Sequence, residues 1–291
     1  MSTLRLLVKP TIFTVGVCGT CFCVASIAQH ENNKSRFPFG AAAPRKRPAA
    51  SVFQDWTQQQ QRLNLANSFG DLRRKINAWK NGLTTGQKIA CGTIFINFVV
   101  FCGWRSRALI PVMNQFFLSQ TSKTSIPLSP MILSCFSHSS ALHFGVNMYA
   151  LYSFSTIANA LLGPEQLIGL FIGAGTVSSL ASIAHRLITG RVVPSLGASG
   201  ALLGVIAYVC VTRPDSGLLL FFIPLAAGTA IKGLMLVDTV GLLARWSFID
   251  HAAHLGGSLF GVWYATYGER LFYDNRRKVV EQWIKLRSKL D

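Results

Sequence analysis

The feature that most constrains this chain is a long stretch with almost no charge. From Ile89 to Gly268, 180 residues contain eight Lys/Arg and four Asp/Glu. Soluble globular domains carry about 25% charged residues, whereas this chain of 291 residues is 13% charged and 50% hydrophobic. The pattern excludes a disordered chain, a coiled coil and an ordinary soluble enzyme. It predicts an all-α protein that crosses a bilayer several times.

Apolar segments of about spanning length divide the chain. The first, at 11–28, follows a short basic N-terminus at 1–10 and has no acidic residue before Glu31. A cleaved targeting segment is the alternative, but no small-residue cleavage site follows, so a retained spanning helix is favoured. Six further helices are expected within 87–268, near 87–104, 141–162, 166–184, 197–212, 217–237 and 251–268. We see no internal repeat.

Two polar flanks hold most of the net charge of +17. Residues 1–88 have 13 Lys/Arg and three Asp/Glu and contribute +10. The tail at 269–291 has seven Lys/Arg and four Asp/Glu and contributes +3. This favours charge retained at a bilayer surface over nucleic-acid binding, for which there is no motif. In the linker at 29–86, the spacing of apolar residues over Phe69–Leu83 predicts an amphipathic helix on a membrane surface.

A few strongly polar residues lie within the apolar segments, where such groups are functional candidates by default. They are His143 and Asn147 in the second core helix, Ser199 in the fourth and His254 in the sixth. Alternate helices cross in the same direction, and each residue lies near the leading end of its helix. All four are therefore expected at a similar depth below the same membrane face.

These residue types fit acyl transfer. Ser199 is a potential nucleophile and His254 a potential base. His143 and Asn147, one turn apart, together with the Ser199 amide, can donate to a developing oxyanion. Close approach of the two helices that carry Ser199 and His254 is predicted from small residues near the site, namely Gly197, Gly200, Gly257 and Gly261.

The pattern differs from that of soluble hydrolases. Their nucleophile elbow reads G-x-S-x-G between a strand and a helix, whereas Ala201 stands two residues after Ser199 and an apolar helix follows. Asp250, one turn before His254, could orient the imidazole, but a residue in that position is more often a helix cap. A Ser–His dyad is therefore expected.

A metal-binding transporter is an alternative of a different class. His251 and His254 are three residues apart and could share an ion, with His143 nearby. The sequence places no carboxylate along a path through the membrane, which argues against this function. The seven cysteines lie in or beside apolar runs and are interpreted as small buried residues, not disulfide partners or metal ligands.

H-x-x-x-N, G-x-S-G and A-H-x-x-G on alternate helices resemble the rhomboid intramembrane serine proteases. The stretches KPTIFTVG, FSHSSALHFGVNMYALYSFS, PSLGASGA and DHAAHLGGSLFGVWYATYGE are similar to the mitochondrial branch of that family. The resemblance implies a six-helix core with one extra N-terminal spanning helix. It also implies Ser199 as nucleophile, His254 as base, and His143, Asn147 and the Ser199 amide as the oxyanion hole. Many bacterial members have a Tyr four residues after the nucleophile, where this chain has Leu203, so His254 has to be held differently.

The resemblance further implies a multi-pass protein of the inner mitochondrial membrane that needs no metal or cofactor. Its expected partners are lipid and single-span membrane protein substrates, including an imported mitophagy kinase and a membrane-anchored phosphatase, with effects on mitophagy, apoptosis and cristae. Homo- or hetero-oligomers in the membrane are left open. An inactive relative that binds membrane proteins is another alternative, and the presence of both Ser199 and His254 argues against it. Positive-inside bias would open the site to the intermembrane space.

Overall fold

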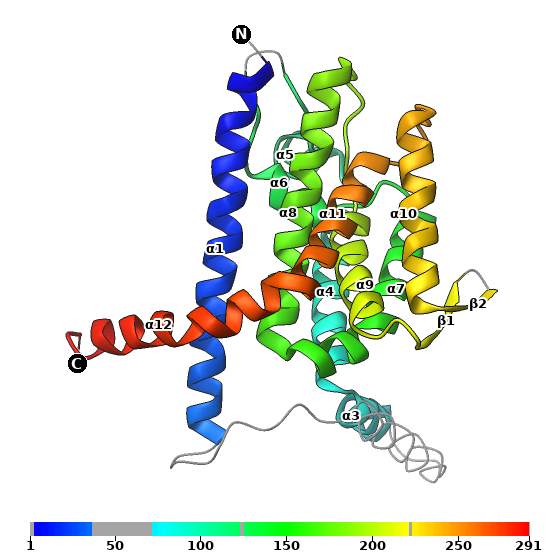
Figure 1. Cartoon of the computed structure of the whole chain (residues 1–291). Helices are drawn as coiled ribbons and strands as arrows, with labels where there is room; N and C mark the ends of the chain where they lie inside the picture. Colours follow the sequence, from blue (N-terminus) through cyan, green and yellow to red (C-terminus); the bar gives the residue numbers. More distant parts are fainter. Residues whose placement is uncertain (1–2, 37–71, 123–124, 221–222, 291) are drawn as a thin grey trace.

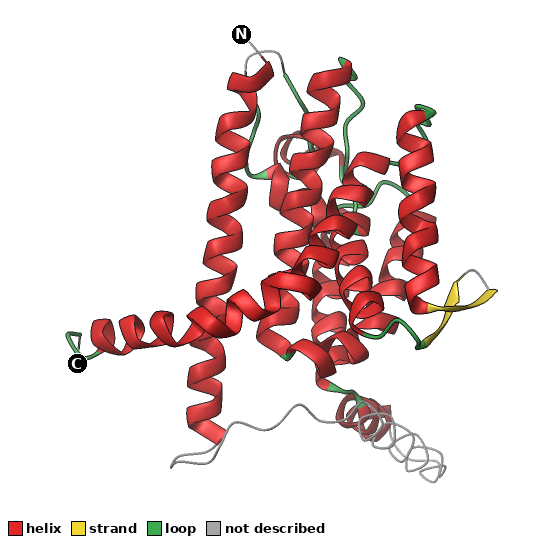
Figure 2. Cartoon of the chain, in the orientation of Figure 1, coloured by secondary structure: helices red, strands yellow, loops and turns green. Residues whose placement is uncertain are grey.

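The computed structural model describes residues 3–36, 72–122, 125–220 and 223–290 (Figure 1). Most of these residues are helical, and among the described residues strands occur only in one short hairpin (Figure 2). The long helices are α1 (Thr3–Arg36), α4 (Thr85–Gly103), α7 (Ala141–Leu162), α8 (Pro164–Thr189), α9 (Ser199–Thr212), α10 (Ala227–Leu243), α11 (His251–Trp263) and α12 (Glu269–Arg287). The shorter elements are α3 (Leu72–Gly82), η1 (Arg107–Leu109), α5 (Ile110–Phe116), α6 (Pro130–Leu133), η2 (Ser134–Phe136), β1 (Gly217–Leu220), β2 (Ile223–Ala226) and the π-helix η3 (Tyr264–Gly268).

Local sequence signals account for several helix ends. The Thr84 hydroxyl accepts from the Gln87 amide at 3.1 Å while the Gln87 side chain accepts from the Thr84 amide at 2.9 Å, a capping box that starts α4. α7 ends at Gly163, whose φ of 81° suits only glycine, and Pro164 then begins α8. These signals divide one apolar stretch into two antiparallel helices.

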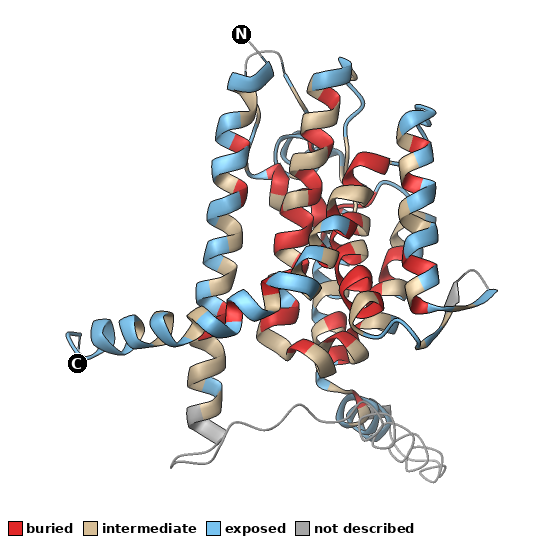
Figure 3. Cartoon of the chain, viewed as in Figure 1, coloured by how far each residue is buried: buried red, intermediate tan, exposed pale blue. Residues whose placement is uncertain are grey.

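The core of the bundle is α9. Ten of its 14 residues are buried, and it contacts α7, α8, α10 and α11. α1 lies outside this core, against α8 and α12. Buried residues concentrate along α9 and the facing parts of α8 and α11, whereas α1, α10 and α12 expose much of their surface (Figure 3).

The helices differ in whether they are long and apolar enough to cross a membrane. By length and apolar composition, three of the described helices could cross one: Thr3–Asn33, Thr85–Gly103 and Pro164–Thr189. The apolar α9 is shorter, about 21 Å at a rise of about 1.5 Å per residue. The residues before it, 191–198, are not helical, so an irregular segment leads to the first residue of α9.

The helix predicted over 217–237 is wrong in its first half. Gly217–Leu220 and Ile223–Ala226 pair as the antiparallel strands β1 and β2, with Pro224 opposite Leu219, and α10 begins only at Ala227 and continues to Leu243. A short apolar run does not distinguish a strand from a buried helix, and proline disfavours a helix interior. As a result, Asp238 lies well inside a helix and not in a connection.

The flanking elements also differ from expectation. α1 extends well beyond 11–28 at both ends, and the C-terminal tail forms α12. Within the stretch predicted as an amphipathic helix, the described residues form α3, with Ile76 and Trp79 about half exposed. Phe69 and most of the linker lie outside the described residues.

Candidate active site

Glycines bring the helices that carry Ser199 and His254 into backbone contact. A Cβ on Gly257 would lie 2.0 Å from the Gly200 carbonyl oxygen, and one on Gly261 would lie 2.1 Å from that of Gly204. Only glycine fits such distances. α9 and α11 therefore form a closely packed pair, with Ser199 and His254 on their neighbouring ends.

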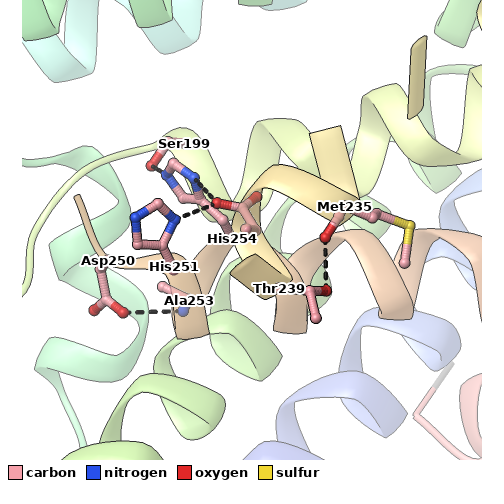
Figure 4. Close-up of polar contacts among 8 residues, drawn as sticks. Ser199, Met235, Thr239, Asp250, His251, Ala253 and His254 are labelled. Atoms are coloured by element: carbon pink, nitrogen blue, oxygen red, sulfur yellow. Dashed lines mark hydrogen bonds and ion pairs between the residues drawn. The ribbon is translucent and has the colours of Figure 1, made fainter. Parts of the chain in front are cut away.

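The hydroxyl of Ser199 lies 2.8 Å from Nε2 of His254 (Figure 4). Ser199 is the first residue of α9, so its amide is among those that have no partner within the helix. The side chain of His254 is 16% exposed. The contact can pass a proton from the hydroxyl to the imidazole, and the free amide can donate to an oxyanion.

Asp238 is the residue that sequence reasoning missed. Its Oδ1 lies 3.3 Å from Nδ1 of His254 and 2.8 Å from Nδ1 of His251, and its side chain is only 5% exposed. An acidic residue next to a long apolar run is the signal that could have found it. The expected helix over 217–237 ends one residue before Asp238, which places the carboxylate in a connection.

Asp250 does not orient His254. Its carboxylate accepts from the Ala253 amide at 3.0 Å, as a helix cap, and from the hydroxyl of Ser182. Burial alone would raise the pKa of Asp250, but hydrogen bonds, including one from Ser195, and the Arg186 charge hold it below its ordinary value. Asp250 therefore joins the start of α11 to α8.

The segment that leads to Ser199 is held by a buried arginine. Arg186 of α8 donates to the Ser119 carbonyl at 2.8 Å, to its hydroxyl at 2.9 Å and to the Val193 carbonyl at 3.1 Å. Ser119 and Ser195 form an antiparallel bridge. Arg186 thus pins the loop after α5 to the segment before α9, a role that the sequence pattern did not indicate.

His143 lies beside the nucleophile. Gly197, whose φ is 136°, has no side chain to occupy this place, and a Cβ there would be 2.7 Å from Cε1 of His143. Asn147 is buried, and its amide donates to the His143 carbonyl at 2.8 Å. The structure therefore gathers Ser199, His254 and His143, and turns the amide of Asn147 to its own helix.

A cavity of about 700 Å³ opens at these residues. His143, Ser199 and His254 line it, together with Trp246 and Phe248 of the loop between α10 and α11. Such a volume admits water and an extended peptide segment. Within the described residues, no group of three His, Cys, Asp or Glu side chains is arranged to hold a metal ion.

Residues 127–270 match the rhomboid domain family. The presenilin-associated rhomboid-like protein, mitochondrial, of Homo sapiens is 40% identical over 98% of this chain and 73% of its own length. The presenilin-associated rhomboid-like protein A, mitochondrial, of Danio rerio is 39% identical, over 97% and 76%. Rhomboid protein 1, mitochondrial, of Saccharomyces cerevisiae is 35% identical over 67% of this chain and 57% of its own length.

The chain belongs to the rhomboid family of intramembrane serine proteases. Among them it is similar to the presenilin-associated rhomboid-like proteins, and it is a multi-pass protein of the mitochondrial inner membrane. The prediction of an all-α polytopic rhomboid protein is confirmed.

Proposed function

We propose that this protease cleaves within or beside the transmembrane segment of single-span proteins by means of a serine activated by a histidine. The observation that carries the proposal is the 2.8 Å contact between the Ser199 hydroxyl and His254 Nε2 at the wall of a cavity. A serine hydroxyl is a weak nucleophile unless a base takes its proton. An imidazole titrates near neutrality and suits that task.

The peptide bond to be cut must first leave its helix, because its carbonyl is otherwise hydrogen-bonded and shielded by side chains. Ser199 Oγ then bonds to the carbonyl carbon while His254 Nε2 takes the hydroxyl proton. The same proton goes to the departing amine, which leaves an acyl-enzyme. Water that reaches the cavity hydrolyses this ester and returns the serine.

The oxyanion that forms in each step needs hydrogen-bond donors. The Ser199 amide and the His143 imidazole are adjacent to the nucleophile. Asn147 can join them, because its side-chain amide has two N–H groups and the bond to the His143 carbonyl uses one of them. These donors together would form the hole.

The substrate class follows from the family resemblance. Single-span proteins of the inner mitochondrial membrane, including an imported kinase of mitophagy and a membrane-anchored phosphatase, are the proposed substrates. Release of their fragments would connect this protease to mitophagy, apoptosis and cristae maintenance. The active site is proposed to face the intermembrane space, because the basic flanks favour the matrix side.

The test is cleavage of a single-span reporter by the full chain in liposomes, comparing wild type with Ser199→Ala and His254→Ala. We expect wild type alone to cleave, with both variants at the rate of liposomes without protein. Ser199 should also react covalently with a fluorophosphonate in the wild type and not in Ser199→Ala. Cleavage by Ser199→Ala at the wild-type rate would overturn the assignment of the nucleophile.

A further inference from the structure

A carboxylate inside the helix bundle requires an explanation. Asp238 lies in α10, is 5% exposed, and is flanked along the chain by Val237 and Thr239. A charge or polar group at such a place is costly unless it has partners. Its contacts are with two imidazoles, those of His251 and His254, both through Oδ1.

The contact with His254 constrains the tautomer of that ring. When Nε2 is the atom that takes the serine proton, the one hydrogen of the neutral ring must lie on Nδ1. Nδ1 is the atom that faces Asp238, at 3.3 Å. The carboxylate therefore favours the tautomer that can act as a base, and it stabilises the positive ring that forms when the proton arrives.

His251 is placed so that it holds Asp238. Its Nδ1 lies 2.8 Å from the carboxylate, while its Nε2 is buried without a hydrogen-bond partner. The ring fits against Gly241, one turn after Asp238, where a Cβ would come within 2.4 Å of Nε2. The ring of Phe248 packs on it edge to face, with centroids 5.5 Å apart.

We propose that Asp238 and His251 are positioning residues for this protease: His251 donates to Asp238, and Asp238 aligns His254 for proton transfer from Ser199. The proposal rests on the function proposed above. Protons move only among Ser199, His254 Nε2, the leaving amine and the water that hydrolyses the acyl-enzyme. Nδ1 keeps its hydrogen throughout, and no proton passes to Asp238. Neither positioning residue touches the substrate.

The first test is Asp238→Asn in the full chain in liposomes. Asparagine keeps the volume and loses the charge, so we expect kcat to fall about 100-fold or more with KM nearly unchanged. The rate of Ser199 labelling by a fluorophosphonate should fall with kcat. A kcat within threefold of the wild type, or a KM increase that accounts for the whole loss, would overturn the role of Asp238.

The second test separates the His251 hydrogen bond from its volume. His251→Leu removes the donor, whereas the amide of His251→Asn can replace Nδ1. We expect kcat to fall at least tenfold in the leucine variant and to recover most of that loss in the asparagine variant. Equal kcat values in the two variants would overturn the role of His251.

A third variant moves the His251 ring without altering either partner. Gly241→Ala places a methyl group where the ring now lies, so we expect a loss of kcat similar to that of His251→Leu. Gly233→Ala is the matched control on the same helix, because a Cβ there meets nothing within 4 Å. Equal kcat values for both alanine variants would contradict the proposal.

Ser199→Ala, measured beside them, distinguishes a failure of the positioning role from a failure of the proposed function. If it is inactive while Asp238→Asn and His251→Leu match the wild type, the positioning role fails and the proposed function stands. If Ser199→Ala is active, the proposed function itself fails.

Discussion

The two ends of α9 carry two polar clusters that differ in residue type and in the size of the cavity beside them. At the first end, Ser199 and His254 line a cavity of about 700 Å³. At the other end, Tyr208 is fully buried and donates to Glu269 at 2.8 Å. Nine residues, or about 13 Å along a helix, separate Ser199 from Tyr208.

The second cluster continues through Gln166, which accepts from Tyr264 at 3.0 Å and donates to the Tyr273 hydroxyl at 3.3 Å. It joins α8, α9, η3 and α12 and lies by a cavity of only about 50 Å³. Beside the first cluster, in contrast, His251 retains a buried nitrogen without a hydrogen-bond partner. The enclosed cluster is therefore expected to stabilise the fold, and the cluster at the larger cavity is expected to support activity.

The largest expected effect is a loss of activity when the first cluster is altered, without a matching loss of stability. Ser199→Ala should lower kcat by at least about 1,000-fold, while the unfolding temperature in detergent stays close to that of the wild type, because no packing is lost. Activity on a reporter and thermal unfolding are measured on the same preparation. A large drop in unfolding temperature would show that the first cluster also stabilises the fold.

Next in size is the effect of disturbing the contact between α9 and α11, the helices that carry Ser199 and His254. Gly257→Ala places a Cβ 2.0 Å from the Gly200 carbonyl oxygen, so the free energy of unfolding should fall by about 1–3 kcal/mol and activity should fall as well. Gly92→Ala in α4 is the control, since a Cβ there meets nothing within 4 Å. Equal unfolding temperatures of the two variants would argue against the close contact.

The second cluster should respond in the opposite way to the first. Tyr208→Phe leaves the Glu269 carboxylate without this donor, so stability should fall by about 1–3 kcal/mol with kcat nearly unchanged. Tyr267→Phe, at a ring that is 69% exposed, is the matched control and should change neither quantity. A selective loss of kcat in Tyr208→Phe would mean that the two ends of α9 are coupled.

The smallest effect concerns the cap of α11 and depends on pH. Because the pKa of Asp250 is below its ordinary value of 3.8, the ionised carboxylate stabilises the fold above that value. The contribution is lost as the pH falls through the lowered pKa. Asp250→Asn keeps an oxygen that can cap α11 but loses the charge that faces Arg186 and the hydrogen-bond donors. It should therefore cost about 1 kcal/mol at pH 7, and the difference from the wild type should shrink below about pH 4.

Thermal unfolding of both proteins between pH 7 and pH 3 measures this difference. Asp215→Asn, at an exposed carboxylate, is the control for general effects of acid. A difference that stays constant down to pH 3 would contradict the assigned role of Asp250.

The sequence predicted part of the candidate site, where a chemically suitable residue type and its expected depth in the membrane pointed to the same place. Ser199 and His254 were expected together because each begins a helix that crosses in the same direction, and the structure places them 2.8 Å apart. Their roles stay predictions, as do those of His143 and Asn147. The orientation of the Asn147 amide depends on a rotamer, which spacing along a helix does not determine.

Asp238 could not be found in the same way. The hydropathy of the run over 217–237 fits a helix. The hairpin that replaces its first half is defined by backbone pairing of β1 with β2, which hydropathy does not reveal. The resulting shift of α10 moves one carboxylate from a supposed loop to the side of His254. The cavity, and the hydrogen bonds of Arg186 to Ser119, likewise join segments that are far apart in the sequence.

Asp238 stands on a different helix from the serine and the base. α9 and α11 are joined by backbone contacts at glycines, whereas α10 exposes Leu236, Val237, Val240 and Leu243 to its surroundings. Bilayer thickness and lateral pressure act on such an outer helix directly. Any displacement of α10 away from α11 withdraws the carboxylate from His254, so turnover should depend on the mechanical state of the surrounding lipid.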